Sequence, residues 1–197
     1  MYVTDDMIAA MVARYGPPHR RKFELETNAR ELARIRSSQT HGRNHDVTLY
    51  IRKGEQLVVI AKHIYPPDLY RAPSGGLKPG EDFETGINRE IAEETGCRIE
   101  LKRFLLQTDV WFNHEGDQVY WRSFVFLADY VDGDFQYTDH DEILEVHLAG
   151  WDEFDAFGRT MRTMEFGGLH YRAALHETVV ELMIDENLSG PKRGDAH

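Results

Sequence analysis

The order of strand-like and helix-like segments limits the possible folds of this 197-residue chain more than any other feature. One helix-like segment stands between two earlier and three later strand-like runs, and further helix-like segments close the chain. Parallel strand pairs need a long crossover, and only one connection between these runs has room for a helix. The order therefore favours an α+β fold with a mixed, partly antiparallel sheet flanked by helices. The strand-like runs are 46–52, 56–62, 98–112, 118–131 and 142–151, and the helix-like segments are 84–95, 151–157 and 169–186.

The first 44 residues differ from the rest in pattern and charge. An amphipathic helix is expected at 4–15, and the basic stretch that follows is expected to be part helix, starting near Thr27 or Asn28. This part holds eight basic and five acidic residues, or +3, so the remainder of a chain with net charge -11 carries -14. We predict an N-terminal helical extension at 1–44, a main domain at 45–185 and a flexible tail at 186–197.

Composition excludes several classes of protein. No apolar run approaches 18 residues, so no membrane-spanning helix is expected. A single cysteine rules out an internal disulfide framework and predicts a cytoplasmic location. The acidic main domain argues against binding long nucleic acids, whose phosphates bind basic surfaces, but it allows small phosphorylated ligands bridged by metal cations.

Three carboxylates lie close together on the predicted helix at 84–95. Glu90, Glu93 and Glu94 are spaced i, i+3 and i+4, so their side chains emerge on one face although like charges there repel. A solvated acidic surface is one interpretation. The other is a site for a hard divalent cation, which prefers oxygen ligands such as carboxylates.

The neighbouring residues favour the cation site. Gly75 and Gly76 precede the helix and permit a close approach of the backbone to phosphate or metal. Arg89 can form a bidentate pair with a carboxylate and hold it in place. A glycine loop, a helix and an acidic cluster in this order describe a site for a metal and a phosphate.

The same stretch resembles the Nudix box. That pattern is a glycine, five residues, a glutamate, seven residues, Arg-Glu, an aliphatic residue, any residue, Glu-Glu, any residue, glycine and an aliphatic residue. Cys97 stands at the last aliphatic position, a mild departure because cysteine packs as a small hydrophobe. The matching residues are Gly75, Glu81, Arg89, Glu90, Ile91, Glu93, Glu94 and Gly96.

The resemblance implies a Nudix-type α/β/α sandwich over about 45–185 and hydrolysis of a nucleoside diphosphate linked to another group, with Mg²⁺ or Mn²⁺. Carried over by position, the implied metal ligands are Glu90, Glu93, Glu94 and a carbonyl near Gly75. Glu93 would also position or deprotonate water, Arg89 would orient Glu90 or Glu81, and Glu81 would support the metal ligands from behind. The general base of some members lies on a later loop, where Glu142 is the candidate here.

The substrate stays open at this level. Aromatic residues that stack on a base are expected, and we predict Tyr70 and Trp111, with Gly76, as substrate-binding residues, although strand aromatics are more often core. Nucleotide sugars, nucleoside triphosphates, dinucleotides and capped RNA ends are all compatible, RNA ends least so because the domain is acidic. A non-catalytic nucleotide-binding module is the alternative to an enzyme, and the basic extension could hold a partner or form a homodimer.

Overall fold

The computed structural model describes residues 3–188, so the predicted tail at 186–197 lies mostly outside the described residues. No described helix is both long and apolar enough to cross a membrane. The helices are α1 (Asp5–Tyr15), α2 (Ala29–Ser37), the short 3₁₀ helix η1 (Thr40–Gly42), α3 (Phe83–Thr95), α4 (Trp151–Thr163) and α5 (Gly167–Asp185). The strands are β1 (His19–Glu26), β2 (His45–Lys53), β3 (Gln56–Lys62), β4 (Ser74–Gly75), β5 (Cys97–His114), β6 (Asp117–Gly133) and β7 (Ile143–Ala149).

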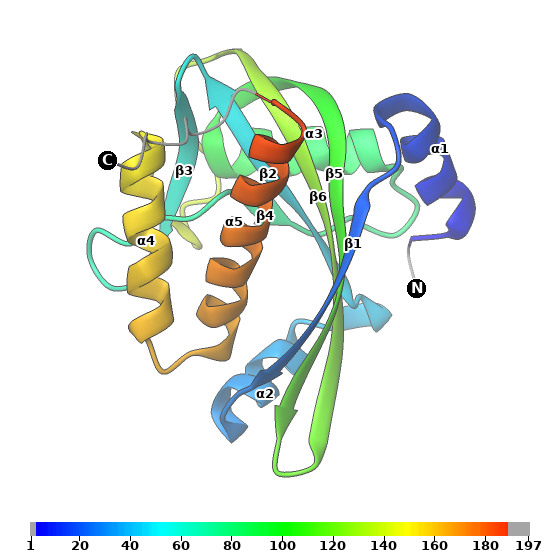
Figure 1. Ribbon diagram of the computed structural model, residues 1–197, viewed down its shortest axis with the longest axis vertical. Helices are drawn as coiled ribbons and strands as arrows, with labels where there is room; N and C mark the ends of the chain where they lie inside the picture. Colours follow the sequence, from blue (N-terminus) through cyan, green and yellow to red (C-terminus); the bar gives the residue numbers. More distant parts are fainter. Residues whose placement is uncertain (1–2, 189–197) are drawn as a thin grey trace.

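One twisted mixed sheet forms the middle layer of the molecule (Figure 1). Its strand order is β1-β5-β6-β2-β3-β7, and β4 pairs with β2 beside this path. The β1–β5 and β2–β6 pairs are parallel, and the other pairs are antiparallel. The predicted mixed sheet with helices around it is confirmed.

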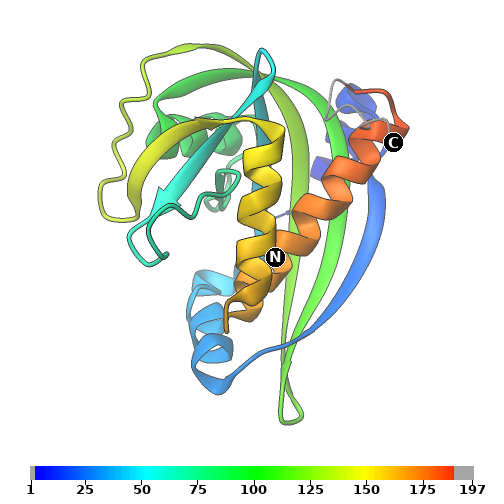
Figure 2. The ribbon, with the colours of Figure 1, turned by 60° about the vertical axis from the view of Figure 1, so that its left-hand side comes forward.

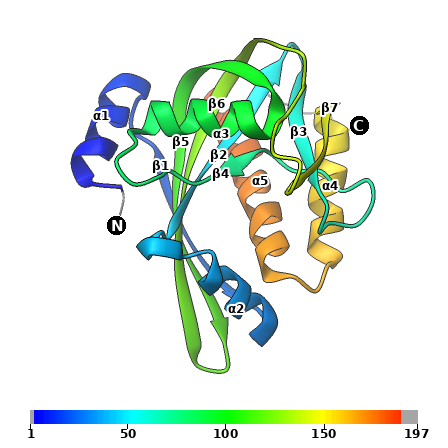
Figure 3. The same ribbon diagram turned by 180° about the vertical axis from the view of Figure 1, so that it is seen from behind.

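Helices cover both faces of the sheet. α4 and α5 lie over one face, as the rotated view in Figure 2 shows. α3 and α1 lie over the other, which faces the viewer in Figure 3. Each face buries its own apolar cluster, because strand side chains alternate between the two sides. The result is the three-layer α/β/α arrangement.

The central helix α3 has clear sequence signals at both ends. The Asp82 side chain accepts a hydrogen bond from the Thr85 backbone N–H at 2.9 Å and so caps its first turn. Ile87 and Ile91 are fully buried against the sheet and fix which face of the helix turns inward. Gly96 ends the helix in the left-handed conformation, at φ 67°, which favours glycine.

The N-terminal extension contributes a strand that the sequence did not predict. β1 pairs in parallel with β5 and forms the edge of the sheet, while α1 and α2 are the expected helices. Phe23 and Leu25 pack against the core, and Glu24 between them and the charged residues on either side are exposed. The strand signal is weak because exposed charged residues are common on edge strands and hide the apolar alternation.

The extension packs on the body of its own chain. Tyr15 and Arg14 of α1 both bind the Glu84 carboxylate on α3, and Met11 is buried in the adjoining apolar cluster. Arg103 of β5 donates to the backbone carbonyls of Tyr15 and Pro17 at 3.3 and 2.9 Å. Residues 3–44 therefore join the same layers as the main domain, and a homodimer stays a prediction.

A buried carboxylate ties α2 to the start of α5. Glu31 is 7% exposed and accepts hydrogen bonds from the backbone N–H groups of Gly167 and Gly168 and from the Thr27 hydroxyl. These N–H groups belong to the first turn of α5, which has no side-chain cap of its own. Glu31 supplies this cap from the N-terminal extension.

We expect Glu31→Ala to lower the free energy of unfolding by about 2–3 kcal/mol, because three donors lose their acceptor in a buried place. Chemical denaturation measures the change. Glu24→Ala, on the exposed side of β1, is the matched control and is expected within about 0.5 kcal/mol of the unsubstituted protein. Equal stability of the two variants would contradict the capping role.

Candidate active site

The predicted carboxylates lie where α3 passes the short strand β4. Glu90 accepts a hydrogen bond from the Gly76 backbone N–H at 3.2 Å, and Glu94 accepts one from the Ser74 N–H at 2.9 Å. Glu93 is farther from β4, and 40% of its side chain is exposed. Two of the three carboxylates thus face the glycine loop directly, and the third faces solvent beside it.

Arg89 organises the first part of the site. Its guanidinium contacts Glu81 through two hydrogen bonds of 2.7 and 2.8 Å and also donates to Glu90 at 2.9 Å and Glu93 at 3.0 Å. A further bond of 3.0 Å reaches the Gly76 carbonyl. The hydrogen bonds from Arg89 lower the pKa of Glu81 to about 2, so Glu81 remains an anion that anchors the guanidinium. Arg89 therefore fixes the loop and three carboxylates at once.

Glu94 is the buried member of the trio. It is 3% exposed, and burial raises the pKa of its carboxyl group. Its Oε2 takes the Ser74 hydrogen bond, and its Oε1 lies 3.5 Å from Nζ of Lys62. An ionised carboxylate at this depth needs such a cation, because desolvation alone would favour the neutral form.

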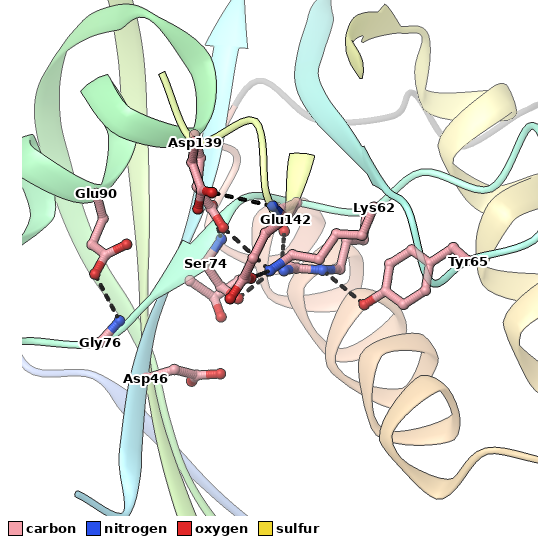
Figure 4. A network of polar contacts seen from close by, with 12 residues as sticks. Asp46, Lys62, Tyr65, Ser74, Gly76, Glu90, Asp139 and Glu142 are labelled. Atoms are coloured by element: carbon pink, nitrogen blue, oxygen red, sulfur yellow. Dashed lines mark hydrogen bonds and ion pairs between the residues drawn. The ribbon is translucent and has the colours of Figure 1, made fainter. Parts of the chain in front are cut away.

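Lys62 also binds Glu142, which brings the predicted late-loop residue to the site (Figure 4). Lys62 ends β3, whereas Glu142 immediately precedes β7. The Lys62 ammonium lowers the pKa of Glu142, whose side chain is 62% exposed. Glu142 is thus an ionised carboxylate at the rim of the site, as a general base requires.

The loop that carries Glu142 is docked on α3. The backbone N–H groups of Thr138 and Asp139 donate to the Glu93 carbonyl at 2.9 and 3.0 Å. Asp139 in turn accepts from the Glu142 N–H at 3.1 Å. The end of α3 therefore sets the position of Glu142 through two backbone hydrogen bonds and the Asp139 side chain.

Two arginines contact the start of the glycine loop. Arg71 and Arg172 both donate to the Ser74 hydroxyl, at 2.8 and 3.0 Å. Arg172 comes from α5 and forms an ion pair of 2.7 Å with the buried Asp46 of β2. Arg71 instead donates to neutral oxygens, including the Tyr65 hydroxyl at 3.1 Å. Arg172 thereby connects helix α5 to β2 and to Ser74 at the start of the glycine loop.

The residue types fit a hard divalent cation. Three carboxylates and the carbonyl groups of the glycine loop are oxygen donors of the kind that Mg²⁺ and Mn²⁺ bind. A Cβ atom on Gly75 would lie 2.0 Å from Oε2 of Glu90, so only glycine allows this approach. In the described residues, however, no three acidic, histidine or cysteine side chains converge closely enough to hold a metal ion. Arg89 and Lys62 engage the carboxylates instead, so binding a metal requires these ion pairs to rearrange.

The predicted aromatic residues lie away from the carboxylates. Tyr70 donates to Glu145 at 3.0 Å and packs near His147, with ring centroids 5.2 Å apart. Trp111 lies in the distal part of the β5–β6 hairpin, with its ring 5.4 Å from that of Tyr120. Neither forms a hydrogen bond or ion pair with the trio among the described residues, and their roles in substrate binding stay predictions.

Several residues of the site carry no local sequence signal. Lys62 ends an ordinary apolar strand, Arg71 lies in a loop, and Arg172 sits in a helix nearly 100 positions after the glycine pair. Only the pairing of β2, β3 and β4 and the packing of α5 bring them together. A search for cations near apolar strand ends could have marked Lys62, but nothing in the sequence distinguishes Arg172.

Comparisons with known proteins agree with this geometry. The NUDIX domain family model matches residues 40–167. The NAD-capped RNA hydrolases NudC of Chromobacterium violaceum and Haemophilus influenzae are 28% and 29% identical to this chain over 106 and 112 residues. These matches cover 54% and 55% of this chain but only 36% and 39% of the relatives.

Solved structures show the same fold. A NUDIX hydrolase from Nitrosomonas europaea aligns with a TM-score of 0.53 at 19% identity, covering 73% of this chain and 89% of that one. The pyrophosphohydrolase BsRppH of Bacillus subtilis aligns with a TM-score of 0.52 at 16% identity, covering 74% and 84%. With a family match over more than half of its length and a three-layer fold around the glutamate-rich helix, the chain belongs to the Nudix hydrolase family.

Proposed function

We propose that this protein is a divalent-metal-dependent pyrophosphohydrolase that cleaves a nucleoside diphosphate linked to another group. The observation that carries the proposal is the contact between α3 and the glycine loop. Glu90 and Glu94 accept backbone hydrogen bonds from the loop, and Arg89 binds both the loop and the carboxylates. Carboxylate oxygens held beside the backbone of a glycine loop suit a metal–diphosphate complex.

Each residue has a distinct proposed role. Glu90, Glu93, Glu94 and the Gly75 carbonyl hold Mg²⁺ or Mn²⁺, which would neutralise the diphosphate and acidify the attacking water. Arg89 keeps Glu90 and Glu93 in position, and Glu81 anchors Arg89. Glu93 or Glu142 accepts the proton of the attacking water, since both carboxylates are partly exposed beside the loop.

The relatives suggest which substrates to test first. Two of them are named as NAD-capped RNA hydrolases, and the NAD moiety contains a diphosphate between two nucleosides. This chain spans little more than a third of their length, so their substrates are candidates here. A free dinucleotide fits the acidic domain better than an RNA chain, because net charge -11 opposes binding of a polyanion.

Activity is expected to disappear on removal of divalent metal and to return with Mg²⁺ or Mn²⁺. The protein is freed of metal with a chelator and then incubated, with or without added Mg²⁺ or Mn²⁺, with candidate substrates. These are nucleotide sugars, nucleoside triphosphates, free dinucleotides and dinucleotide-capped RNA, and mass spectrometry identifies the products. Two phosphorylated products are the expected result, and one of them carries a single ¹⁸O from labelled water, because one water attacks one phosphorus. Full turnover by metal-free protein would contradict the proposal.

A nucleotide-binding module without activity remains the alternative. It predicts saturable nucleotide binding with no product in any arm of the same screen. The complete set of box carboxylates and Arg89 favours the enzyme, because binding alone does not require a water-activating group.

A further inference from the structure

Lys62 occupies a position that the sequence pattern does not explain. It is the last residue of β3, where the pairing with β7 shifts register between Ala61 and Lys62. Such irregularities turn a side chain away from the regular direction of the strand. Here the side chain is 12% exposed and reaches between Glu94 and Glu142.

Lys62 neutralises the buried oxygen of Glu94. One oxygen of Glu94 accepts the Ser74 hydrogen bond, and the other faces the Lys62 ammonium at 3.5 Å. Within residues 3–188 this is the ion pair that Glu94 makes, because the nearby Arg71 donates to Tyr65, Ala72 and Ser74. A carboxylate that is 3% exposed is costly without nearby cations; Arg71 and Lys62 both favour its charged form, and Lys62 forms the ion pair with it.

A divalent ion bound to Glu94 would compete for the same oxygen. The ammonium and a doubly charged ion repel each other at ionic contact distances, most strongly in a half-buried place. Lys62 has another partner in Glu142, and its four-carbon stem allows the ammonium to move. Its partner Glu142 is 62% exposed, so movement toward Glu142 would bring the ammonium to the solvent-facing edge of the site.

We propose that Lys62 exchanges partners during the reaction cycle. Without metal it neutralises Glu94; when the divalent ion binds, Lys62 leaves Glu94 and contacts non-bridging phosphoryl oxygens of the substrate. Lys62 therefore opposes metal binding and favours substrate binding. The second half rests on the proposed function, whereas the first half concerns metal binding alone.

The test measures Mn²⁺ affinity and turnover of Lys62→Met. The substitution keeps an unbranched side chain that is one atom shorter and removes its charge. We expect Mn²⁺ to bind about tenfold more tightly without substrate, because the competing cation is gone. We also expect kcat/KM to fall about 30-fold, mainly through KM, because a phosphate contact is lost. Titration calorimetry measures the affinity, and initial rates measure kcat and KM.

Two further variants make the result specific. Lys62→Arg keeps the charge, so its Mn²⁺ affinity should be close to the weaker affinity of the unsubstituted protein. Lys102→Met removes a lysine that pairs with Glu100 and Asp129 away from the site, and it should change neither quantity by more than about twofold. Circular dichroism checks that each variant is folded.

The two halves fail in different ways. Unchanged or weaker Mn²⁺ binding by Lys62→Met would overturn the competition, because the lysine would then be neutral to the metal or help to build its site. Tighter Mn²⁺ binding with unchanged KM would overturn the substrate contact. If no substrate is cleaved by any variant, the proposed function fails, yet the metal titration still decides the role of Lys62 at Glu94.

Discussion

Glu93→Gln is expected to lose at least two orders of magnitude in turnover while keeping its fold. The change preserves the shape of the side chain and leaves an oxygen that can accept the hydrogen bond from Arg89, which is 3.0 Å long in the unsubstituted protein. It removes one negative charge from the proposed metal site. A hundredfold loss corresponds to about 3 kcal/mol of activation free energy. Stability should hold or rise slightly, because like charges on one helix face repel less. Steady-state kinetics and thermal melting measure the two effects.

The control must be a glutamate without a partner that matters for the fold. Glu84 lies on the same helix outside the box pattern, but Arg14 and Tyr15 bind it, so Glu84→Gln tests the attachment of α1. Glu181→Gln, at an exposed position of α5, is the better control and should stay within a few-fold of full turnover. If Glu93→Gln is as active as Glu181→Gln, Glu93 neither holds the metal nor positions the attacking water.

Arg89→Ala is expected to lose both activity and stability. Removing the guanidinium leaves Glu81, Glu90 and Glu93 close together without their common cation, and it frees the Gly76 carbonyl. Breaking a fully buried pair costs about 3–5 kcal/mol. The Arg89 side chain is 19% exposed, so about 2–3 kcal/mol of unfolding free energy is expected here. Turnover should fall at least a hundredfold because the carboxylates lose their positions.

The effect of Mg²⁺ on the melting temperature is a second test of the role of Arg89. Metal bound by the carboxylates would replace part of the missing positive charge, so Mg²⁺ should raise the melting temperature of Arg89→Ala more than that of the unsubstituted protein. Arg98→Ala is the control, since it breaks an exposed ion pair with Asp132 on the hairpin. A loss of stability in Arg89→Ala that Mg²⁺ leaves unchanged would separate Arg89 from the proposed metal site.

The sequence predicted the central helix and its surroundings well. Strand-like runs marked β2, β3, β5, β6 and β7, and the helix-like composition at 84–95 delimited α3 to within one residue. These features depend on local preferences and on burial of one face of each element. The burial of Cys97, at 5% exposure, also agrees with its interpretation as a small hydrophobe.

Edge pairing was not predictable in the same way. β1 has only two core-facing residues between exposed charges, and its place beside β5 depends on the length of the β5–β6 hairpin. The Glu31 cap of α5 joins residues 136 positions apart, so no local pattern predicts it. Both features belong to the N-terminal extension, whose helices alone were expected.

The sequence by itself determined the family, the mixed sheet and the identity of the acidic residues on α3, because these follow from spacing within one helix and from local hydrophobic patterns. Only the tertiary structure decided how the carboxylate charges are compensated. Arg89 lies on the same helix as the trio, but Lys62 and Glu142 come from the ends of two neighbouring strands and Arg172 from α5. Electrostatic compensation depends on distance in space and on burial, and neither quantity is encoded in the spacing of residues along the chain.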